Sequence, residues 1–369
     1  MFLLDRRYLA SFDWMSLLIS ITLASIGVIF VFSATYTQEE PYSIFFKKQL
    51  FGVLSGLIIY GIFCFTDFRT LTRWGYFAYY GVILLLIFTI IKGSIGMGGQ
   101  RWINLGFMKF QPSELAKLLF PAYTIYYLYT GNNHQRLTMH DFTPVLIMLG
   151  ISFILIRKQP DLGTALLLLF SAIILLWLAG INRAFFIITM SIGCIGAPIL
   201  WSSLKEYQKQ RILVFLGHGD VRKERYQLEQ SKIAIGSGGL WGKGFLQGTQ
   251  NKLQFLPESR TDFIFSVIAE EMGLCGTLCI LVLYILLFVR LLTIIATIRS
   301  LSIQLLALGV VLHIMLSTLI NIGMVIGLLP IVGIPLPFIS YGLSNLWITF
   351  ASLGWFNSIA MRRFYINNT

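Results

Sequence analysis

Long apolar runs separated by short polar links dominate the pattern along this chain. Ten runs are close to the ~20 residues that cross a bilayer as a helix. A membrane span must satisfy its own backbone hydrogen bonds, so each run predicts a transmembrane helix and the fold class is an all-α polytopic membrane protein. The predicted spans are residues 14–34, 45–65, 74–92, 114–130, 142–157, 161–180, 184–201, 264–289, 303–328 and 341–360.

The same pattern predicts the organisation of the chain. An even number of spans places both termini on one side of the membrane, which we expect to be cytoplasmic. The longest polar stretch, about 202–263, then forms an extracytoplasmic loop between spans 7 and 8 of a single domain covering 1–369. A cleavable signal peptide is not expected, because Arg6 and Arg7 precede a first run as long as a full span.

Composition strengthens the membrane assignment and removes several kinds of site. Hydrophobic residues make up 56% of the chain and charged residues 12%, and the mean hydropathy is +0.77, outside the range of ordinary soluble domains. The four cysteines lie inside apolar runs, so we expect neither a disulfide nor a metal cluster. The four histidines lack zinc-binding spacing.

The distribution of basic residues supports this orientation only weakly. With cytoplasmic termini, ten Lys and Arg side chains fall on the inner side, whereas the positive-inside rule expects a clear inner excess. The short outer loops and nearby helix ends carry eight: Lys47, Lys48, Lys92, Arg101, Lys109, Lys117, Arg157 and Lys158. Two interpretations remain open: a solvated surface that meets anionic headgroups, or a pocket for a polyanion such as a lipid pyrophosphate.

The first of three polar clusters is GMGGQRWINLGFMKFQPSELAK, residues 96–117. Gln111 or Ser113 could cap the helix that opens there. Glu114 and Lys117 are three residues apart, close enough to pair on one helical face. Such a pair at membrane depth serves either function or structure, and the sequence does not decide between them.

The second cluster, RKQPDLGTA at 157–165, is a very short link that carries Arg157, Lys158 and Asp161. Asp161 could act only as a helix N-cap. The third cluster is the long loop, whose glycine-rich part AIGSGGLWGKGFLQGTQ, 234–250, lacks the GxxxxGK[ST] pattern of a nucleotide P-loop. Those glycines would suit close approach to a ligand or a re-entrant loop.

FLPESRTDFIF, residues 255–265, follows directly. Pro257 suits the first turn of a helix, which would place Glu258 and Asp262 four residues apart on one face at the outer entrance of the eighth span. Capping would need only one of these acids. Two acids together with Arg260 within five residues therefore favour a functional site.

Taken together, four stretches resemble the SEDS family (shape, elongation, division and sporulation). They are GGQRWINLG…FQPSELAK, QPDLGTA, QSKIAIGSGGLWGKGFLQGTQ…LQFLPESRTDFIFSVIAEEMG and NIGMVIGLLPIVGIPLPFISYG. The resemblance runs from about Asp13 to Met361 and is closer to the rod-shape branch, RodA, than to the division branch, FtsW. Three features depart from the usual pattern: Arg260 where relatives often have histidine, SYGLS instead of SYGG, and a more basic GHGDVRKERYQLEQS.

This resemblance implies a ten-span peptidoglycan glycosyltransferase of the bacterial plasma membrane that polymerises lipid II during cell elongation and releases undecaprenyl pyrophosphate. It implies a class B penicillin-binding protein and the elongation machinery as partners, and no nucleic acid. The family's catalytic aspartate maps to Asp262. The other motif positions, expected to bind substrate, are Arg101, Glu114, Lys117, Lys158, Asp161, Lys243, Glu258 and Arg260.

The chemistry is consistent with these residue types. A sugar hydroxyl is a poor nucleophile, and one carboxylate within hydrogen-bond reach can act as its general base. The departing pyrophosphate needs cations rather than a second acid. No cofactor is certain from the sequence; a divalent cation, Mg²⁺ or Mn²⁺, is an alternative source of positive charge.

Two other functions stay open at this point. Intramembrane charges, glycine-rich segments and a basic cavity would also suit a flippase for a lipid-linked sugar, although no clear inverted repeat is visible. The chain could also be a scaffold for a partner enzyme. The crowded cationic setting of Asp262 favours the polymerase.

Overall fold

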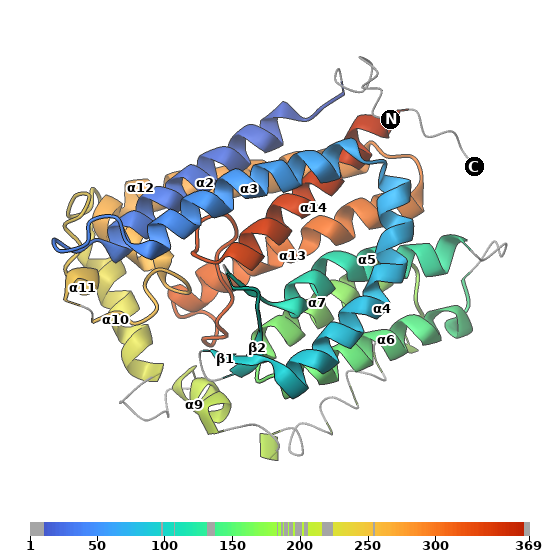
Figure 1. Cartoon of the computed structure of the whole chain (residues 1–369), viewed down its shortest axis with the longest axis horizontal. Coiled ribbons are helices and arrows are strands. Elements are labelled where there is room, and N and C mark those ends of the chain that lie inside the picture. The colour runs from blue at the N-terminus through green and yellow to red at the C-terminus, as the bar shows by residue number, and fades with distance from the viewer. Residues whose placement is uncertain are drawn as a thin grey trace.

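The computed structural model describes residues 11–96, 99–106, 108–130, 137–182, 184–185, 187, 191, 195, 201–202, 206–215, 224–253 and 255–364. Helices dominate these residues (Figure 1). The long ones are α2 (Trp14–Thr35), α3 (Ile44–Phe65), α4 (Phe68–Lys92), α5 (Pro112–Thr130), α6 (Met139–Lys158), α7 (Leu162–Leu178), α12 (Ile264–Ala296), α13 (Leu301–Val325) and α14 (Leu343–Arg362).

Each of these nine helices coincides with a predicted span, with ends shifted by up to seven residues. Six of them, α2, α3, α4, α6, α12 and α13, are long and apolar enough to cross a bilayer. Helix α7 is apolar but has 17 residues. The predicted span 184–201 lies largely outside the described residues.

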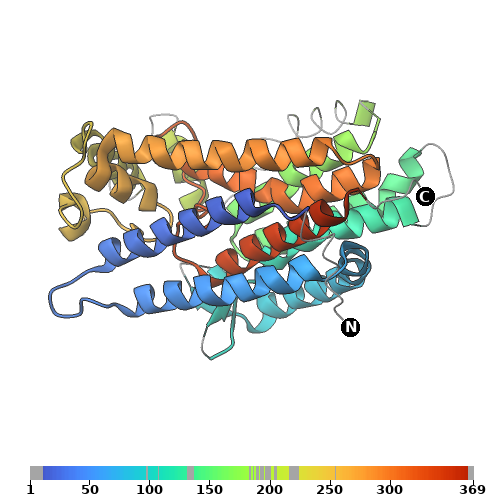
Figure 2. The same cartoon turned by 90° about the horizontal axis from the view of Figure 1, so that it is seen from above.

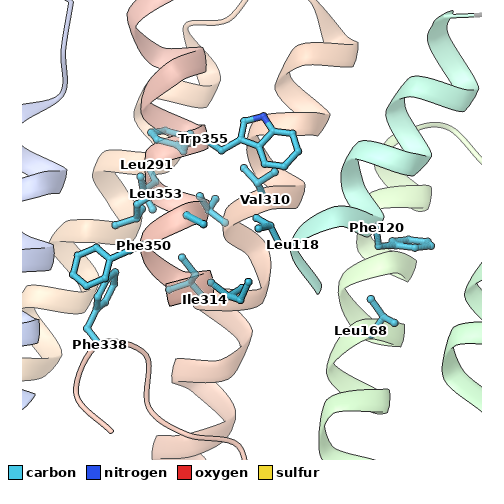
Figure 3. Close-up of a cluster of buried hydrophobic side chains, with 14 of the residues drawn as sticks. Leu118, Phe120, Leu168, Leu291, Val310, Ile314, Phe338, Phe350, Leu353 and Trp355 are labelled. Atoms are coloured by element: carbon cyan, nitrogen blue, oxygen red, sulfur yellow. The ribbon is translucent and has the colours of Figure 1, made fainter. Parts of the chain in front are cut away.

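Helix α14 forms the centre of the bundle, packed against α3, α13, α5 and α4. All its residues except Trp347 and Arg362 are buried. Figure 3 shows Phe350, Leu353 and Trp355 of this helix among apolar side chains from neighbouring segments. A Cβ at Gly354 would overlap the Tyr60 carbonyl, so this glycine permits the close approach of α14 to α3.

Both described ends of the chain lie at one end of the bundle. The backbone N–H of Asp13 donates to the Asn357 side chain at 3.2 Å, and Arg363 donates to the Ser11 carbonyl at 3.5 Å. Arg290, near the last turn of α12, binds the Asp13 carboxylate at 2.8 Å. This arrangement is the one expected for an even number of spans.

The opposite end of the bundle carries structure that the apolar pattern did not predict. Strands β1 (Ser94–Gly96), β2 (Gly99–Asn104) and β3 (Lys109–Phe110) form an antiparallel sheet in the order β1-β2-β3, with Ser94 opposite Trp102 and Ile103 opposite Phe110. The long loop contains α9 (Glu206–Phe215), α10 (Glu224–Ser237) and α11 (Thr249–Lys252). Figure 2 shows the yellow α10–α11 region gathered at one end of the orange α12.

Helix α12 is broken by the glycine-rich loop. Gly273 has φ 66° and ψ −164°, which interrupts the helix. The carbonyls of Glu270 and Glu271 accept the N–H groups of Lys243 and Gly244, each at 2.9 Å. Beyond the break, the N–H groups of residues 274 and 275 donate to the carbonyls of 239 and 240. The glycine-rich segment thus supplies partners for the backbone groups that the break exposes.

Candidate active site

Residues 256–263 form a series of turns, so the prediction of a helix starting at Pro257 is wrong. Helix α12 begins at Ile264. Glu258 has a φ of +54°, a left-handed conformation that stops helix propagation. Its carbonyl accepts the N–H groups of Thr261 at 3.1 Å and Phe263 at 3.3 Å. Glu258 and Asp262 therefore do not share a helical face.

Distant elements hold this turn in place. The backbone carbonyls of residues 260–262 each accept one hydrogen bond. Their donors, in order, are the Tyr341 N–H at 2.9 Å, the Ser340 hydroxyl at 2.6 Å and the Asn321 amide at 3.0 Å. Because these carbonyls bind α13 and the loop before α14, the local preference of Pro257 for a helix is overridden.

Asp262 lies half-buried at the end of this turn, two residues before α12. Helix α12 runs from there to the end of the bundle that holds Asp13, so Asp262 is at the end away from the described chain termini. Glu258 is also half-buried, and its carboxylate accepts the Thr261 hydroxyl at 3.1 Å.

The Arg260 guanidinium lies over an aromatic ring from α3. Its guanidinium carbon is 3.9 Å from the centroid of Phe45, within the distance of a cation–π contact. The ring of Tyr341 stands perpendicular to Phe45, with centroids 5.3 Å apart. Asp262 and Arg260 together supply a carboxylate that can take a proton and a guanidinium that can bind an anion.

Glu114 and Lys117 form the predicted pair in the first turns of α5. The Lys117 Nζ is 2.8 Å from Glu114 Oε1, and both side chains are at least 95% buried. The expected capping role of Gln111 or Ser113 is not observed as a hydrogen bond: the Gln111 amide donates to the Ser113 hydroxyl at 2.9 Å and to Asp161 at 2.6 Å.

Asp161 combines the capping role with ion pairing. One carboxylate oxygen accepts the Thr164 N–H at 3.2 Å, as an N-cap of α7 does. The same oxygen lies 3.5 Å from the Arg101 Nη1 on β2. With Gln111 on the other oxygen, this buried aspartate joins the hairpin, α5 and α7. Lys158 is exposed at the last residue of α6.

Lys243 is engaged with an acid that the sequence analysis did not single out. Its Nζ binds Glu270 Oε1 at 2.6 Å and the Thr249 hydroxyl at 2.8 Å. Glu270 is fully buried and also accepts the N–H groups of Thr249 and Gln250. Glu271 accepts the Ser33 hydroxyl and the Leu246 N–H. The two glutamates thus fasten the glycine-rich loop to α12.

Sequence analysis missed several residues that build this end of the molecule: Phe45, Glu270, Glu271, Asn321, Ser340 and Tyr341. A signal was present for the two glutamates, because adjacent acids inside an apolar run are costly unless they are paired. Asn321 in the run of α13 is a similar case. Phe45, Ser340 and Tyr341 carry no comparable local signal.

Two other features, a metal site and an apolar groove, were compared with the predicted site residues. Among the described residues, no group of three His, Cys, Asp or Glu side chains could hold a metal ion. A groove of about 730 Å³ lies between α4 and α5 and is lined by apolar side chains and Gly81. None of the predicted site residues lines that groove.

The chain is similar in sequence to proteins named peptidoglycan glycosyltransferases. It is 38% identical over 319 residues to the peptidoglycan glycosyltransferase MrdB of Escherichia coli, covering 86% of each chain. It is 33% identical over 363 residues to a probable peptidoglycan glycosyltransferase FtsW of a Geobacter species, covering 96% of this chain and 98% of that one. The predicted resemblance to the SEDS proteins is thereby confirmed.

Solved structures agree with the sequence relatives. A peptidoglycan synthase complex, described as coordinating polymerization and crosslinking, contains a chain with a TM-score of 0.80, 26% identity, and coverage of 96% of this chain and 99% of that chain. The rod shape determining protein RodA of Thermus thermophilus matches with a TM-score of 0.71, 26% identity, and coverage of 96% and 98%. The fold is thus that of a polytopic membrane protein. The family model for cell cycle proteins, FtsW/RodA/SpoVE, matches residues 13–365, and the chain therefore belongs to this family.

Proposed function

We propose that this chain is a peptidoglycan glycosyltransferase of the RodA type that polymerises lipid II into glycan strands during cell elongation. Its relatives bear the name peptidoglycan glycosyltransferase. The observation that carries the proposal is the turn at 256–263, where Asp262 and Arg260 stand together on a backbone held by three bonds from α13 and the loop before α14.

In this proposal Asp262 is the general base. It takes the proton from the sugar hydroxyl of the acceptor as that oxygen attacks the anomeric carbon of the donor, and the bond to the lipid pyrophosphate breaks. General bases contribute roughly 10²–10⁴ in rate. The fixed backbone supports this role, because a base must be held in position before the reaction begins.

Basic residues at the same end of the bundle would stabilise the negative charge of the departing diphosphate. Arg260 and Lys158 are the predicted residues whose cationic groups are best placed to meet a ligand, since Arg101, Lys117 and Lys243 bind Asp161, Glu114 and Glu270. We propose that these three ion pairs and Glu258 contribute to the substrate site mainly by fixing the positions of the segments that surround it. A bound Mg²⁺ or Mn²⁺ would add positive charge there.

The proposal includes an orientation and partners. Both termini face the cytoplasm, and the sheet, the glycine-rich loop and Asp262 face the extracytoplasmic side, within a single domain. The described ends lie together at the far end of α12, which supports this orientation. The similarity to a chain of a synthase complex supports a penicillin-binding protein as partner, which we propose is of class B within the elongation machinery.

The test uses purified full-length protein in detergent, supplied with lipid II, with and without Asp262→Ala and with and without a class B penicillin-binding protein. Detergent removes the leaflets between which a flippase would act. Glycan chains that form with the wild type and disappear with Asp262→Ala would support the polymerase. Absence of product with the wild type in the presence of the partner would rule against it and favour transport or scaffolding.

A matched variant separates chemistry from folding. Ser259→Ala lies in the same turn, at a half-buried position two residues before Thr261. It should retain polymerisation, while Asp262→Ala should lose it at the same thermal midpoint. Equal loss in both variants would mean that the turn itself, rather than the carboxylate, is required.

A further inference from the structure

Arg260 differs from three of the other basic residues predicted at the substrate site. Arg101, Lys117 and Lys243 each bind a carboxylate within 3.5 Å. Within the described part of the chain, no ion pair or hydrogen bond engages the Arg260 guanidinium, whose recorded contact is the face of Phe45 at 3.9 Å. Its N–H groups are therefore available to a ligand, because a ring face leaves the edge of the guanidinium unused.

The position of this guanidinium is set from two directions. Its backbone is held by the Tyr341 N–H, which donates to the Arg260 carbonyl at 2.9 Å. Its side chain is held by Phe45, whose ring is in turn buttressed by the perpendicular ring of Tyr341. An arginine fixed at both ends loses little freedom when it binds, so the usual entropic cost of ordering a long side chain is reduced.

Two acids of this region, Glu258 and Glu270, have other partners. The Glu258 carboxylate accepts the Thr261 hydroxyl at 3.1 Å, and Glu270, eight residues beyond Asp262, is saturated by Lys243, Thr249 and Gln250. A planar guanidinium with its edge open and no carboxylate ion pair is suited to bidentate binding of phosphate oxygens.

We propose that Phe45 and Tyr341 are positioning residues that hold Arg260 as a preformed clamp for the diphosphate of the lipid-linked sugar. This rests on the proposed function, and adds to it two aromatic residues and a preferred ligand group for Arg260. The clamp acts in binding: it orients the diphosphate beside Asp262 and does not itself transfer a proton.

The test measures inhibition of polymerisation by inorganic pyrophosphate for the full-length protein in detergent. Phe45→Leu, which keeps an apolar side chain and removes the ring, should raise the inhibition constant about three- to fivefold, the range of an exposed cation–π contact. Arg260→Gln should raise it about tenfold. The KM for lipid II should rise with it, while kcat changes less than about twofold in Phe45→Leu, because a positioning residue for binding leaves the proton transfer intact.

Three controls make the effect specific. Phe46 is the next residue of α3, and its ring contacts are with Phe32 and Tyr42. Phe46→Leu should leave the inhibition constant unchanged. Phe45→Trp, which keeps an aromatic face, should restore it to within about twofold of the wild type. In the Arg260→Gln background, Phe45→Leu should have no further effect, because both residues act through one guanidinium.

If Phe45→Leu fails to fold, a trifluorinated phenylalanine at position 45 retains the ring shape and weakens its attraction for cations. This substitution should also raise the inhibition constant for pyrophosphate. An unchanged constant with the fluorinated ring, or an effect of Phe45→Leu that persists without Arg260, would overturn the proposal.

A binding readout separates this proposal from the polymerase itself. Pyrophosphate should raise the thermal midpoint of the Asp262→Asn protein, and Phe45→Leu should reduce that rise, even though this background makes no glycan. If the wild type makes no glycan but pyrophosphate still raises the thermal midpoint in a Phe45-dependent way, the role of Phe45 is supported and the proposed polymerase activity is rejected. If glycan forms but pyrophosphate binding does not depend on Phe45, only the proposed role of Phe45 is rejected. A Phe45 effect seen only with phosphatidylglycerol, and not with pyrophosphate, would assign the site to a lipid headgroup and overturn the proposal.

Discussion

Asp262, two residues before α12, and Glu270, within α12, are eight residues apart, and these two acids differ in burial. Glu270 is fully buried, and its carboxylate accepts hydrogen bonds from Lys243, Thr249 and Gln250. Asp262 is half-buried, and the bond recorded from Asn321 goes to its backbone carbonyl. The Glu270 carboxylate is thus bound within the protein interior, whereas Asp262 is more accessible and its backbone is held by α13.

This difference supports a structural role for Glu270 and is consistent with the chemical role that we propose for Asp262. A buried charge is tolerated only when its lone pairs are satisfied, and once they are satisfied the group has little capacity left for a substrate. A carboxylate at a half-buried position keeps access to a ligand. Burial, more than sequence neighbourhood, separates Glu270 from Asp262.

The largest expected effect is the loss of polymerisation in Asp262→Asn. The amide has nearly the shape of the acid but cannot take a proton from the acceptor, so the rate should fall at least about 100-fold. The backbone bonds that hold the turn are kept, and the thermal midpoint should stay within about 2 °C of the wild type. Gel analysis of glycan products and thermal unfolding in detergent would measure both; retention of a tenth of the activity would contradict the assigned role.

Glu270→Gln should show the opposite profile. The amide cannot neutralise Lys243 and replaces one acceptor oxygen with a donor, so the free energy of unfolding should fall by about 3 kcal/mol. Specific activity of the protein that remains folded should change much less than in Asp262→Asn. The double variant Lys243→Met with Glu270→Gln should be more stable than the sum of the two single effects predicts, because no unpaired ammonium is left. Strict additivity would mean that the two side chains do not support each other.

Gly242→Ala tests the loop that Glu270 fastens. Gly242 has φ +81°, and a Cβ there would overlap the Glu271 carbonyl, so the substitution should cost about 2 kcal/mol. Gly239 also has positive φ, +55°, but its Cβ would meet open space, and Gly239→Ala should cost only about 1 kcal/mol. Denaturant unfolding of both variants gives the comparison. Equal costs would show that the close approach to α12 contributes nothing.

The sequence predicted most of the helices because their signal is local. A run of about twenty apolar residues can satisfy its backbone only as a helix in the membrane, whatever surrounds it. The pair Glu114–Lys117 was predictable for a similar reason, since both residues lie on one helix at a spacing of three.

The turn at 256–263 was not predictable in the same way. Pro257 gives a real local preference for a helix start, but the outcome depends on donors at 321, 340 and 341, some 60 to 80 residues further along the chain. The ion pair of Arg101 with Asp161 likewise joins distant segments. Asp262 itself was predicted from the motif, whereas the donors that hold its turn required the tertiary structure.

The smallest expected effect comes from Ser340→Ala, which loosens the turn without touching a charged group. The Ser340 hydroxyl donates to the Thr261 carbonyl at 2.6 Å and accepts the Leu336 N–H at 2.8 Å. Alanine removes both bonds at a buried position, so stability should fall by about 1 kcal/mol. Because this bond holds the carbonyl next to Asp262, kcat should fall about fivefold with little change in KM. Ser344→Ala, whose hydroxyl bonds the Lys109 carbonyl instead, is the matched control and should keep kcat. If Ser340→Ala also keeps its kcat, the fixed backbone would not be what prepares Asp262, and its contrast with Glu270 would rest on burial alone.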